Sequence, residues 1–131
     1  MVKFATEEWM KEFCRAMNEN EKFRKASEKW ETPILFIVDD KSKYLEADVF
    51  RGECRGTREV SSPEESKAGF HLSATYDNWA KIARGELGPA KAITIGKMKV
   101  VKGSKMKVLT NIGLFLAMVD AIRSIDSITE Y

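Results

Sequence analysis

The amino-acid sequence predicts an α+β fold, in which helices pack on a single sheet. Its length of 131 residues is typical of one domain, so residues 1–131 are expected to form a single unit. Apolar residues make up 44% of the chain and charged residues 32%, a balance typical of a globular protein rather than a disordered one. Strand-like segments are grouped in the middle of the chain, with helical patterns on both sides. This grouping is typical of α+β architectures.

Two amphipathic helices are expected before the first strand. Thr6 is a suitable N-cap, and large apolar residues recur at every fourth position after it, which predicts a helix over residues 7–18. These residues are Trp9, Phe13 and Met17. A second helix is expected after a break at residues 18–20, and it should end at Thr32 and Pro33 because the residue before a proline disfavours the helical conformation. Its apolar positions are Phe23, Ala26 and Trp30.

Four strands are expected next. Residues 34–38 are short and entirely apolar, which predicts a strand buried on both faces. After a turn at residues 39–42, residues 44–50 alternate between apolar and polar and predict a half-buried antiparallel strand. Its apolar face holds Leu45, Ala47 and Val49. The glycine-containing residues 51–56 predict a turn, and residues 57–62 a short third strand. The fourth strand has one apolar face, made of Ala68, Phe70, Leu72 and Ala74.

The remaining sequence predicts helices around one more strand. A helix that starts at Ser73 or Thr75 should end at Gly85, where a C-terminal glycine is common. A short helix is expected from Pro89 to Gly96. The last strand should then follow, with the apolar residues Met98, Val100 and Val101, and end at Gly103. A helical pattern runs from Ser104 to about Ser127, and Gly113 either splits it or lies inside one helix.

Charge and composition exclude several classes of protein. The formal net charge of +2 argues against a strongly basic nucleic-acid-binding protein. The charge is uneven, since no acidic residue lies between Glu86 and Asp120 while six lysines do. These lysines lack the interleaved aromatic residues that stack on bases, so no specific nucleic-acid partner is expected.

The sequence also bears on location. No apolar run approaches the roughly 20 residues of a membrane-spanning helix, and the first residues lack the long apolar stretch of a signal peptide. Cys14 and Cys54 are far apart and form no CxxC motif, which indicates reduced thiols in a cytoplasmic protein. A single disulfide between them stays open.

The residues that carry common catalytic chemistry are sparse. The one histidine, His71, is expected on the outward, solvated face of a strand, and Asp39 and Asp40 are expected in a polar turn. No phosphate-binding glycine loop, nucleophile elbow or zinc-ligand spacing occurs. We therefore expect no enzyme, no catalytic residue, no cofactor and no metal site.

A longer stretch of sequence is more informative. It contains AGFHLS at residues 68–73, YDNW at 76–79, GELGPAKA at 85–92, GKMKV at 96–100 and KG at 102–103. In order and spacing this stretch resembles the sterol carrier protein 2 (SCP2-like) family over about residues 68–109. It departs from the family pattern at Gly88, where an aspartate is frequent before the proline, and at Ser104, where an acidic residue is usual.

The resemblance implies a five-stranded, largely antiparallel sheet with helices on one face around an apolar tunnel. It also implies non-enzymatic binding, with or without transfer, of a lipid such as a fatty acid, a fatty acyl-CoA or a sterol-like molecule. A lipid needs only a dry cavity and a polar mouth, because each methylene that leaves water contributes about 0.8 kcal/mol.

Candidate lipid-binding residues lie on the expected terminal helix and on the elements before it. They are Trp79, Ile82, Met98, Met106, Leu114, Phe115, Met118, Val119 and Ile122. The alternative for each is ordinary core packing.

The lysines near the last strand are candidates for contact with anionic lipid head groups or a transient anionic membrane surface, where each basic residue contributes about 1 kcal/mol. They are Lys97, Lys99, Lys102, Lys105 and Lys107. Their alternative is a solvated cationic face.

Two other functions stay open. In the first, the apolar C-terminal helix packs against a partner protein or a second copy in a homodimer, and no tunnel exists. In the second, a small enzyme uses His71 or a thiol.

Overall fold

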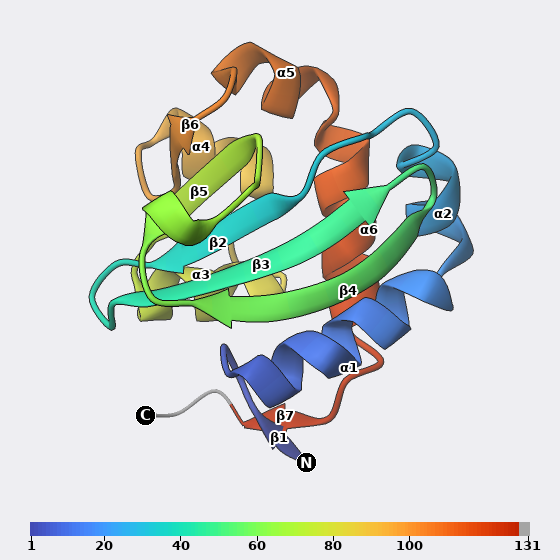
Figure 1. Cartoon of the computed structure of the whole chain (residues 1–131), viewed down its shortest axis with the longest axis horizontal. Helices are drawn as coiled ribbons and strands as arrows, with labels where there is room; N and C mark the ends of the chain where they lie inside the picture. Colours follow the sequence, from blue (N-terminus) through green and yellow to red (C-terminus); the bar gives the residue numbers. More distant parts are fainter. Residues whose placement is uncertain (129–131) are drawn as a thin grey trace.

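A five-stranded sheet forms the centre of the computed structural model, which describes residues 1–128 (Figure 1). Its strand order is β4-β3-β2-β5-β6. The strands are β2 (Ile34–Val38), β3 (Lys43–Phe50), β4 (Glu53–Val60), β5 (Phe70–Ala74) and β6 (Lys99–Lys102). Only the β2–β5 pair within this sheet is parallel. The predicted α+β fold with a mostly antiparallel five-stranded sheet is therefore confirmed.

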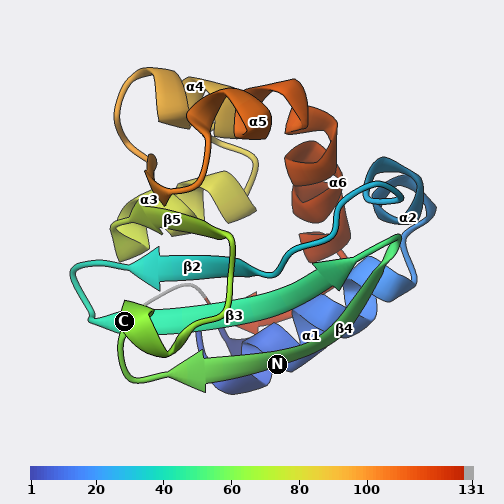
Figure 2. The ribbon, with the colours of Figure 1, turned by 45° about the horizontal axis from the view of Figure 1, so that its top comes forward.

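The longer helices pack against one face of this sheet. Figure 2 shows α1, α3 and α6 behind the strands, while the connection between β4 and β5 passes in front of them. The helices are α1 (Glu7–Asn18), α2 (Glu21–Ala26), α3 (Tyr76–Ala83), α4 (Pro89–Thr94), α5 (Lys105–Thr110) and α6 (Ile112–Ile122). A short 3-10 helix, η1 (Pro63–Glu65), lies in the β4–β5 connection. None of the helices within residues 1–128 is long and apolar enough to cross a membrane.

Polar side chains cap the starts of α1, α2, α3 and α5. Thr6, Asn20, Thr75 and Ser104 each accept a hydrogen bond from the backbone N–H three residues ahead. Such caps satisfy one of the donors that a helix start leaves unpaired. The first helix therefore begins and ends where the sequence predicts.

The second helix is shorter than predicted, because tertiary hydrogen bonds compete for its last turn. It ends at Ala26, and Trp30 lies in the turn that follows. There the backbone carbonyls of Ser27 and Trp30 accept hydrogen bonds from Gly52 and Arg51 of the β3–β4 hairpin. These long-range partners have no local signature in the sequence.

Strand β4, the third of the strands predicted from the sequence, is longer than expected. Arg51 and Gly52 form a two-residue hairpin in which both have positive φ, 43° and 88°, so β4 starts at Glu53 rather than at residue 57. Positive φ at both central residues is typical of the tight turns that match the twist of the flanking strands.

The terminal helical pattern breaks at Asn111, not at Gly113. Asn111 ends α5 and precedes α6, and Gly113 lies within α6. Helix α6 ends at Ile122, whereas the helical pattern of the sequence runs to about Ser127. The chain instead extends into β7 (Ser127–Ile128). This short strand pairs in parallel with β1 (Val2–Lys3), so the two ends of the described chain meet.

Both faces of β2 are buried, as the sequence predicts. Ile34 and Val38 belong to the main core under the helices, while Leu35 and Ile37 form a smaller cluster with Val60 on the outer face. The β4–β5 connection completes this cluster through Ala68, which is fully buried.

This outer cluster corrects the prediction for His71. The side chain was expected in solvent, but only 6% of His71 is exposed. His71 pairs with Leu35 of this cluster on one side and with Lys102 on the other. Its ring is also hydrogen-bonded to the backbone of Ala68 in the β4–β5 connection. The alternation of β5 indicated the correct face, but it could not show that a connecting segment folds over that face.

The two cysteines also differ from the prediction of reduced thiols. Cys14 of α1 and Cys54 of β4 form a disulfide, with their Cα atoms 5.4 Å apart. The helix packs along this strand, which brings together two residues 40 positions apart. Sequence spacing does not show such proximity.

Candidate functional site

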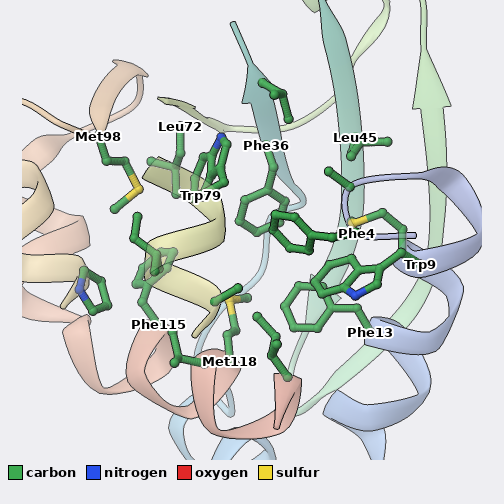
Figure 3. Close-up of a pocket in the computed structure, with 18 residues that line it drawn as sticks. Phe4, Trp9, Phe13, Phe36, Leu45, Leu72, Trp79, Met98, Phe115 and Met118 are labelled. Carbon is green, nitrogen blue, oxygen red and sulfur yellow. The ribbon is translucent and has the colours of Figure 1, made fainter. Parts of the chain in front are cut away.

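An apolar cavity of about 70 Å³ lies between the sheet and the helices. Figure 3 shows its walls, with Trp9 and Phe13 on one side, Phe115 and Met118 on another, and Phe36 and Leu72 of the sheet above them. Every side chain of residues 1–128 that lines it is apolar or aromatic, so no charged group of this part of the chain faces the space. Such a lining attracts hydrocarbon and not ions.

Seven of the nine residues predicted to bind lipid line this cavity. They are Trp79, Ile82, Met98, Phe115, Met118, Val119 and Ile122. They come from α3, the segment before β6, and α6. The structure thus brings together residues spread over more than 40 positions of the chain, while their role in binding lipid stays a prediction.

The other two predicted residues lie elsewhere. Met106 is 67% exposed on α5 and does not line the cavity, because Val108 is the residue of that short helix that turns inward. Leu114 is 1% exposed and packs in the core without facing the cavity. Leu114 therefore lies where the alternative hypothesis, ordinary packing in the core, places it.

Two walls of the cavity were not predicted from the sequence. One is the N-terminal segment with α1, and the other is the sheet itself. The residues that line the cavity from these walls are Phe4, Ala5, Trp9, Met10, Phe13, Phe36, Val38, Leu45 and Leu72. The four-residue spacing of Trp9 and Phe13 and the alternation around Leu45 correctly predicted that these residues are buried. They cannot separate a residue that faces a cavity from one that fills the core.

Aromatic rings stiffen one side of the cavity. The ring centroids of Trp9 and Phe13 are 5.1 Å apart, and Phe36 meets Trp79 edge-on at 5.7 Å. The indole N–H of Trp79 also donates to the carbonyl of Ile37 at 2.8 Å. Trp79 is thus fixed in place, whereas the methionines of the lining have flexible side chains.

Two buried titratable groups with shifted pKa values, His71 and Glu46, lie on the other face of the sheet. Burial lowers the pKa of His71, and the positive charge of Lys102 lowers it further. Burial disfavours the charged form of Glu46, yet hydrogen bonds from Arg58, Ser66 and the Lys67 N–H outweigh this and lower the pKa of its carboxyl. Both groups belong to the outer face, not to the cavity.

The paired carboxylates of the sequence help to fix a helix start. Asp39 and Asp40 lie in the predicted turn, where Asp40 accepts a hydrogen bond from the Tyr76 N–H at 2.8 Å and so helps to fix the start of α3. Within residues 1–128 no three His, Cys, Asp or Glu side chains are grouped to hold a metal ion.

The five predicted lysines are all exposed. They follow one another around β6 and α5, at one edge of the sheet. Lys107 differs from the rest, since its Nζ lies 5.6 Å from the ring centroid of Trp30 and 5.7 Å from that of Phe70. These cation–π contacts hold one charge of the segment close to the protein surface.

Together these observations define the class of protein: a small α+β domain with an apolar cavity between its sheet and its helices. The chain belongs to the SCP-2 sterol transfer family, whose model matches residues 10–116. The resemblance found in the sequence is therefore confirmed.

Solved structures agree with this assignment. A crystal structure of sterol carrier protein 2 is 27% identical, with a TM-score of 0.85 over 95% of this chain and 100% of that chain. The solution structure of a conserved hypothetical protein of Thermus thermophilus, described as possibly a sterol carrier protein, is 28% identical, with a TM-score of 0.79 over 97% of this chain and 92% of that one.

A more distant relative shares the fold alone. Sterol carrier protein 2 from Yarrowia lipolytica, in its apo form, is 15% identical, with a TM-score of 0.60 over 87% of this chain and 88% of that one. None of the curated proteins matches the chain.

Proposed function

We propose that this protein binds a lipid in the cavity between α1, α6 and the sheet, and carries it without chemical change. Candidate ligands are a fatty acid, a fatty acyl-CoA or a sterol-like molecule. The observation that supports this most is the lining of the cavity. Within residues 1–128 all of its side chains are apolar or aromatic, and they come from both halves of the chain. Membership of the SCP-2 sterol transfer family points in the same direction.

The size of the cavity makes a prediction about how a lipid enters. Its volume of about 70 Å³ is well below the roughly 300–1,000 Å³ of typical ligand pockets. A long chain therefore requires side chains to move outward. Met10, Met98 and Met118 are the adaptable members of the lining, since methionine has three rotatable bonds and fills irregular spaces.

The head group of the ligand is proposed to stay outside the apolar lining. Burying an unpaired charge is costly, and no charged side chain of the described residues lines the cavity. The exposed lysines around β6 and α5 then offer attraction to an anionic head group, to the phosphates of an acyl-CoA or to a transient anionic membrane surface.

The test is native mass spectrometry of protein purified from its own host, followed by displacement of a fluorescent fatty acid. A co-purifying lipid and displacement at micromolar concentration support the proposal. Protein that is free of lipid and also binds no fatty acid contradicts it.

A pair of variants on α6 locates the ligand. Met118→Trp adds bulk to the cavity and should weaken binding about tenfold or more, since losing about two buried methylenes costs about 1.6 kcal/mol. Leu116→Trp is the matched control, because Leu116 is 52% exposed on the same helix and should leave binding unchanged. Equal effects of the two variants would place the lipid elsewhere.

The other functions have weaker support. A partner or homodimer contact through α6 needs an exposed apolar face. The large apolar side chains of this helix are buried or half-buried against the chain's own core, except for Leu116, which is exposed. An enzyme based on His71 or a thiol lacks accessible groups, since His71 is buried and both cysteines are in the disulfide.

A cytoplasmic location remains part of the proposal, and the disulfide is the observation that challenges it. Disulfides are rare in cytoplasmic proteins, where thiols are kept reduced. Alkylation of thiols at the moment of cell lysis tests this, because a cytoplasmic protein should yield two modified cysteines.

A further inference from the structure

Trp9 carries a polar group that the fold leaves without a partner. Only 3% of this residue is exposed, and its indole Nε1 finds no hydrogen-bond acceptor within residues 1–128. Buried donors are nearly always paired, because an unpaired one loses its bond to water and gains nothing in return. The other two indoles are paired: Trp30 donates to the carbonyl of Thr32 at 2.6 Å, and Trp79 to that of Ile37 at 2.8 Å.

The position of Trp9 makes its unpaired donor notable. Trp9 lines the apolar cavity, and Figure 3 shows its indole among the other lining side chains. The backbone N–H of Trp9 is capped by Thr6, which fixes the first turn of α1. The ring is then held edge-to-face against Phe4, with centroids 4.8 Å apart, and beside Phe13 at 5.1 Å. The indole is therefore not free to turn toward another acceptor.

Water is a poor partner for this donor. A buried water is held by two to four polar groups, and the side chains that line this cavity are otherwise apolar or, for Trp79, already paired. A charged carboxylate is equally unsuitable, because no cation of the described chain lines the cavity to compensate its burial. A neutral acceptor oxygen attached to hydrocarbon satisfies both the donor and its surroundings.

We infer that Trp9 is a polar anchor of the lipid site, and that the ligand is an apolar molecule with a neutral acceptor oxygen, such as a carbonyl, hydroxyl or ether, buried beside the Trp9 indole. This inference rests on the proposed lipid-binding function and narrows its ligand class. The oxygen accepts the Trp9 N–H, and the hydrocarbon around it fills the apolar lining.

The test compares ligands that differ in one oxygen. Tridecane, 2-tridecanone and 7-tridecanone have the same carbon chain. Tridecane has no carbonyl, whereas the two ketones have a carbonyl on the second carbon and on the central carbon, respectively. The indole N–H signals of the three tryptophans are followed by proton–nitrogen NMR and assigned with the Trp9→Phe, Trp30→Phe and Trp79→Phe variants. At least one ketone should move the Trp9 signal downfield relative to its position in the tridecane complex, as a new hydrogen bond requires. The indole N–H groups of Trp30 and Trp79 are already hydrogen-bonded, so their signals should have the same positions in the tridecane complex and in the ketone complexes.

Affinity provides a second, independent measurement. Trp9→Phe should weaken that ketone relative to tridecane by about three- to tenfold, the usual contribution of one neutral hydrogen bond. Phe13→Leu is the matched control, since it alters a lining side chain on the same helix and should change both affinities by the same factor.

The outcomes separate the inference from the function on which it rests. If tridecane and both ketones bind but the Trp9 signal is the same in all three complexes, the anchor is wrong and the lipid site stands. The same holds if Trp9→Phe and Phe13→Leu change the ketone-to-alkane ratio equally. If none of the three ligands binds, the proposed function itself fails.

Discussion

Glu46 is a carboxylate on β3 that faces away from the helices and is only 7% exposed. It accepts hydrogen bonds from Arg58 at 2.9 Å, from Ser66 and from the Lys67 N–H at 3.1 Å. These bonds join two strands to the β4–β5 connection, which covers the outer cluster. At the scale of single residues, Glu46 therefore holds in place the segment that buries His71.

Replacing Glu46 tests this role through pH. Because the folded-state pKa of Glu46 is lowered, its stabilisation is present above the unfolded value of about 4.5 and is lost as the pH falls through the folded one. Glu46→Gln should reduce the free energy of unfolding by about 1–3 kcal/mol at pH 7, and by less at pH 3. Urea unfolding across this range measures it. Glu53→Gln, on an exposed position of β4, is the control and should change little.

His71 offers a direct readout of the same face. Burial and the charge of Lys102 both lower its pKa, so the imidazole should titrate below its usual value of 6.5. A lowered histidine pKa means that stability is complete above pH 6.5 and is lost as the pH falls through the folded value.

Lys102→Gln removes one of these causes and should raise the pKa of His71. Because the chain has one histidine, its ring proton signals in an NMR titration give the pKa without assignment work. Lys99→Gln is the control, since Lys99 pairs with Ser73 rather than with His71. A larger shift from the control would mean that the Lys102 charge is not the cause.

At the scale of elements, the disulfide connects α1 to β4 and closes a loop of 40 residues. Bonds across loops of this length typically contribute about 2–4 kcal/mol. The Cys14→Ser/Cys54→Ser variant should lose this amount of unfolding free energy in urea. A reducing agent should destabilise the parent chain and leave the double variant unchanged. Equal stability of parent and variant under non-reducing conditions would argue against the bond.

The glycines near α5 and α6 give opposite predictions. A Cβ on Gly113 would meet nothing within 4 Å, and the residue is helical, so Gly113→Ala should stabilise the protein by about 0.5–1 kcal/mol. Gly103 has a φ of 93°, and a Cβ there would lie 2.6 Å from Phe70 Cδ2 and 2.9 Å from the Gly69 carbonyl oxygen. Gly103→Ala should therefore destabilise. Thermal unfolding compares the two, and a destabilised Gly113→Ala would mean that the helix is broken there.

At the scale of the whole molecule, the charge distribution predicts behaviour at membranes. Changing Lys99, Lys102 and Lys105 together to glutamine should weaken binding to anionic vesicles by about two orders of magnitude, since each contributes about 1 kcal/mol at low salt. Changing Lys22, Lys25 and Lys29 to glutamine alters the net charge equally around α2 and is the control. Vesicle co-sedimentation at two salt concentrations measures both, and equal losses would indicate a net-charge effect alone.

Local patterns were sufficient where the cause of structure is local. The cap at Thr6, the spacing of Trp9 and Phe13, and the apolar run of β2 predicted the right elements, because capping and periodicity act over a few residues. The limits of the second helix and of β4 were wrong. Both depend on contacts between the Ser27–Trp30 turn and the Arg51–Gly52 hairpin, which are distant in the chain.

The sequence by itself determined the fold class, the family and most of the α6 wall of the cavity, since these follow from periodicity and from motifs in order. The tertiary structure decided which buried residues face a cavity, that His71 is covered, and that the cysteines meet. It also showed that the Trp9 donor has no partner within residues 1–128. Each of these depends on segments that are far apart in the chain and come together only when the sheet forms.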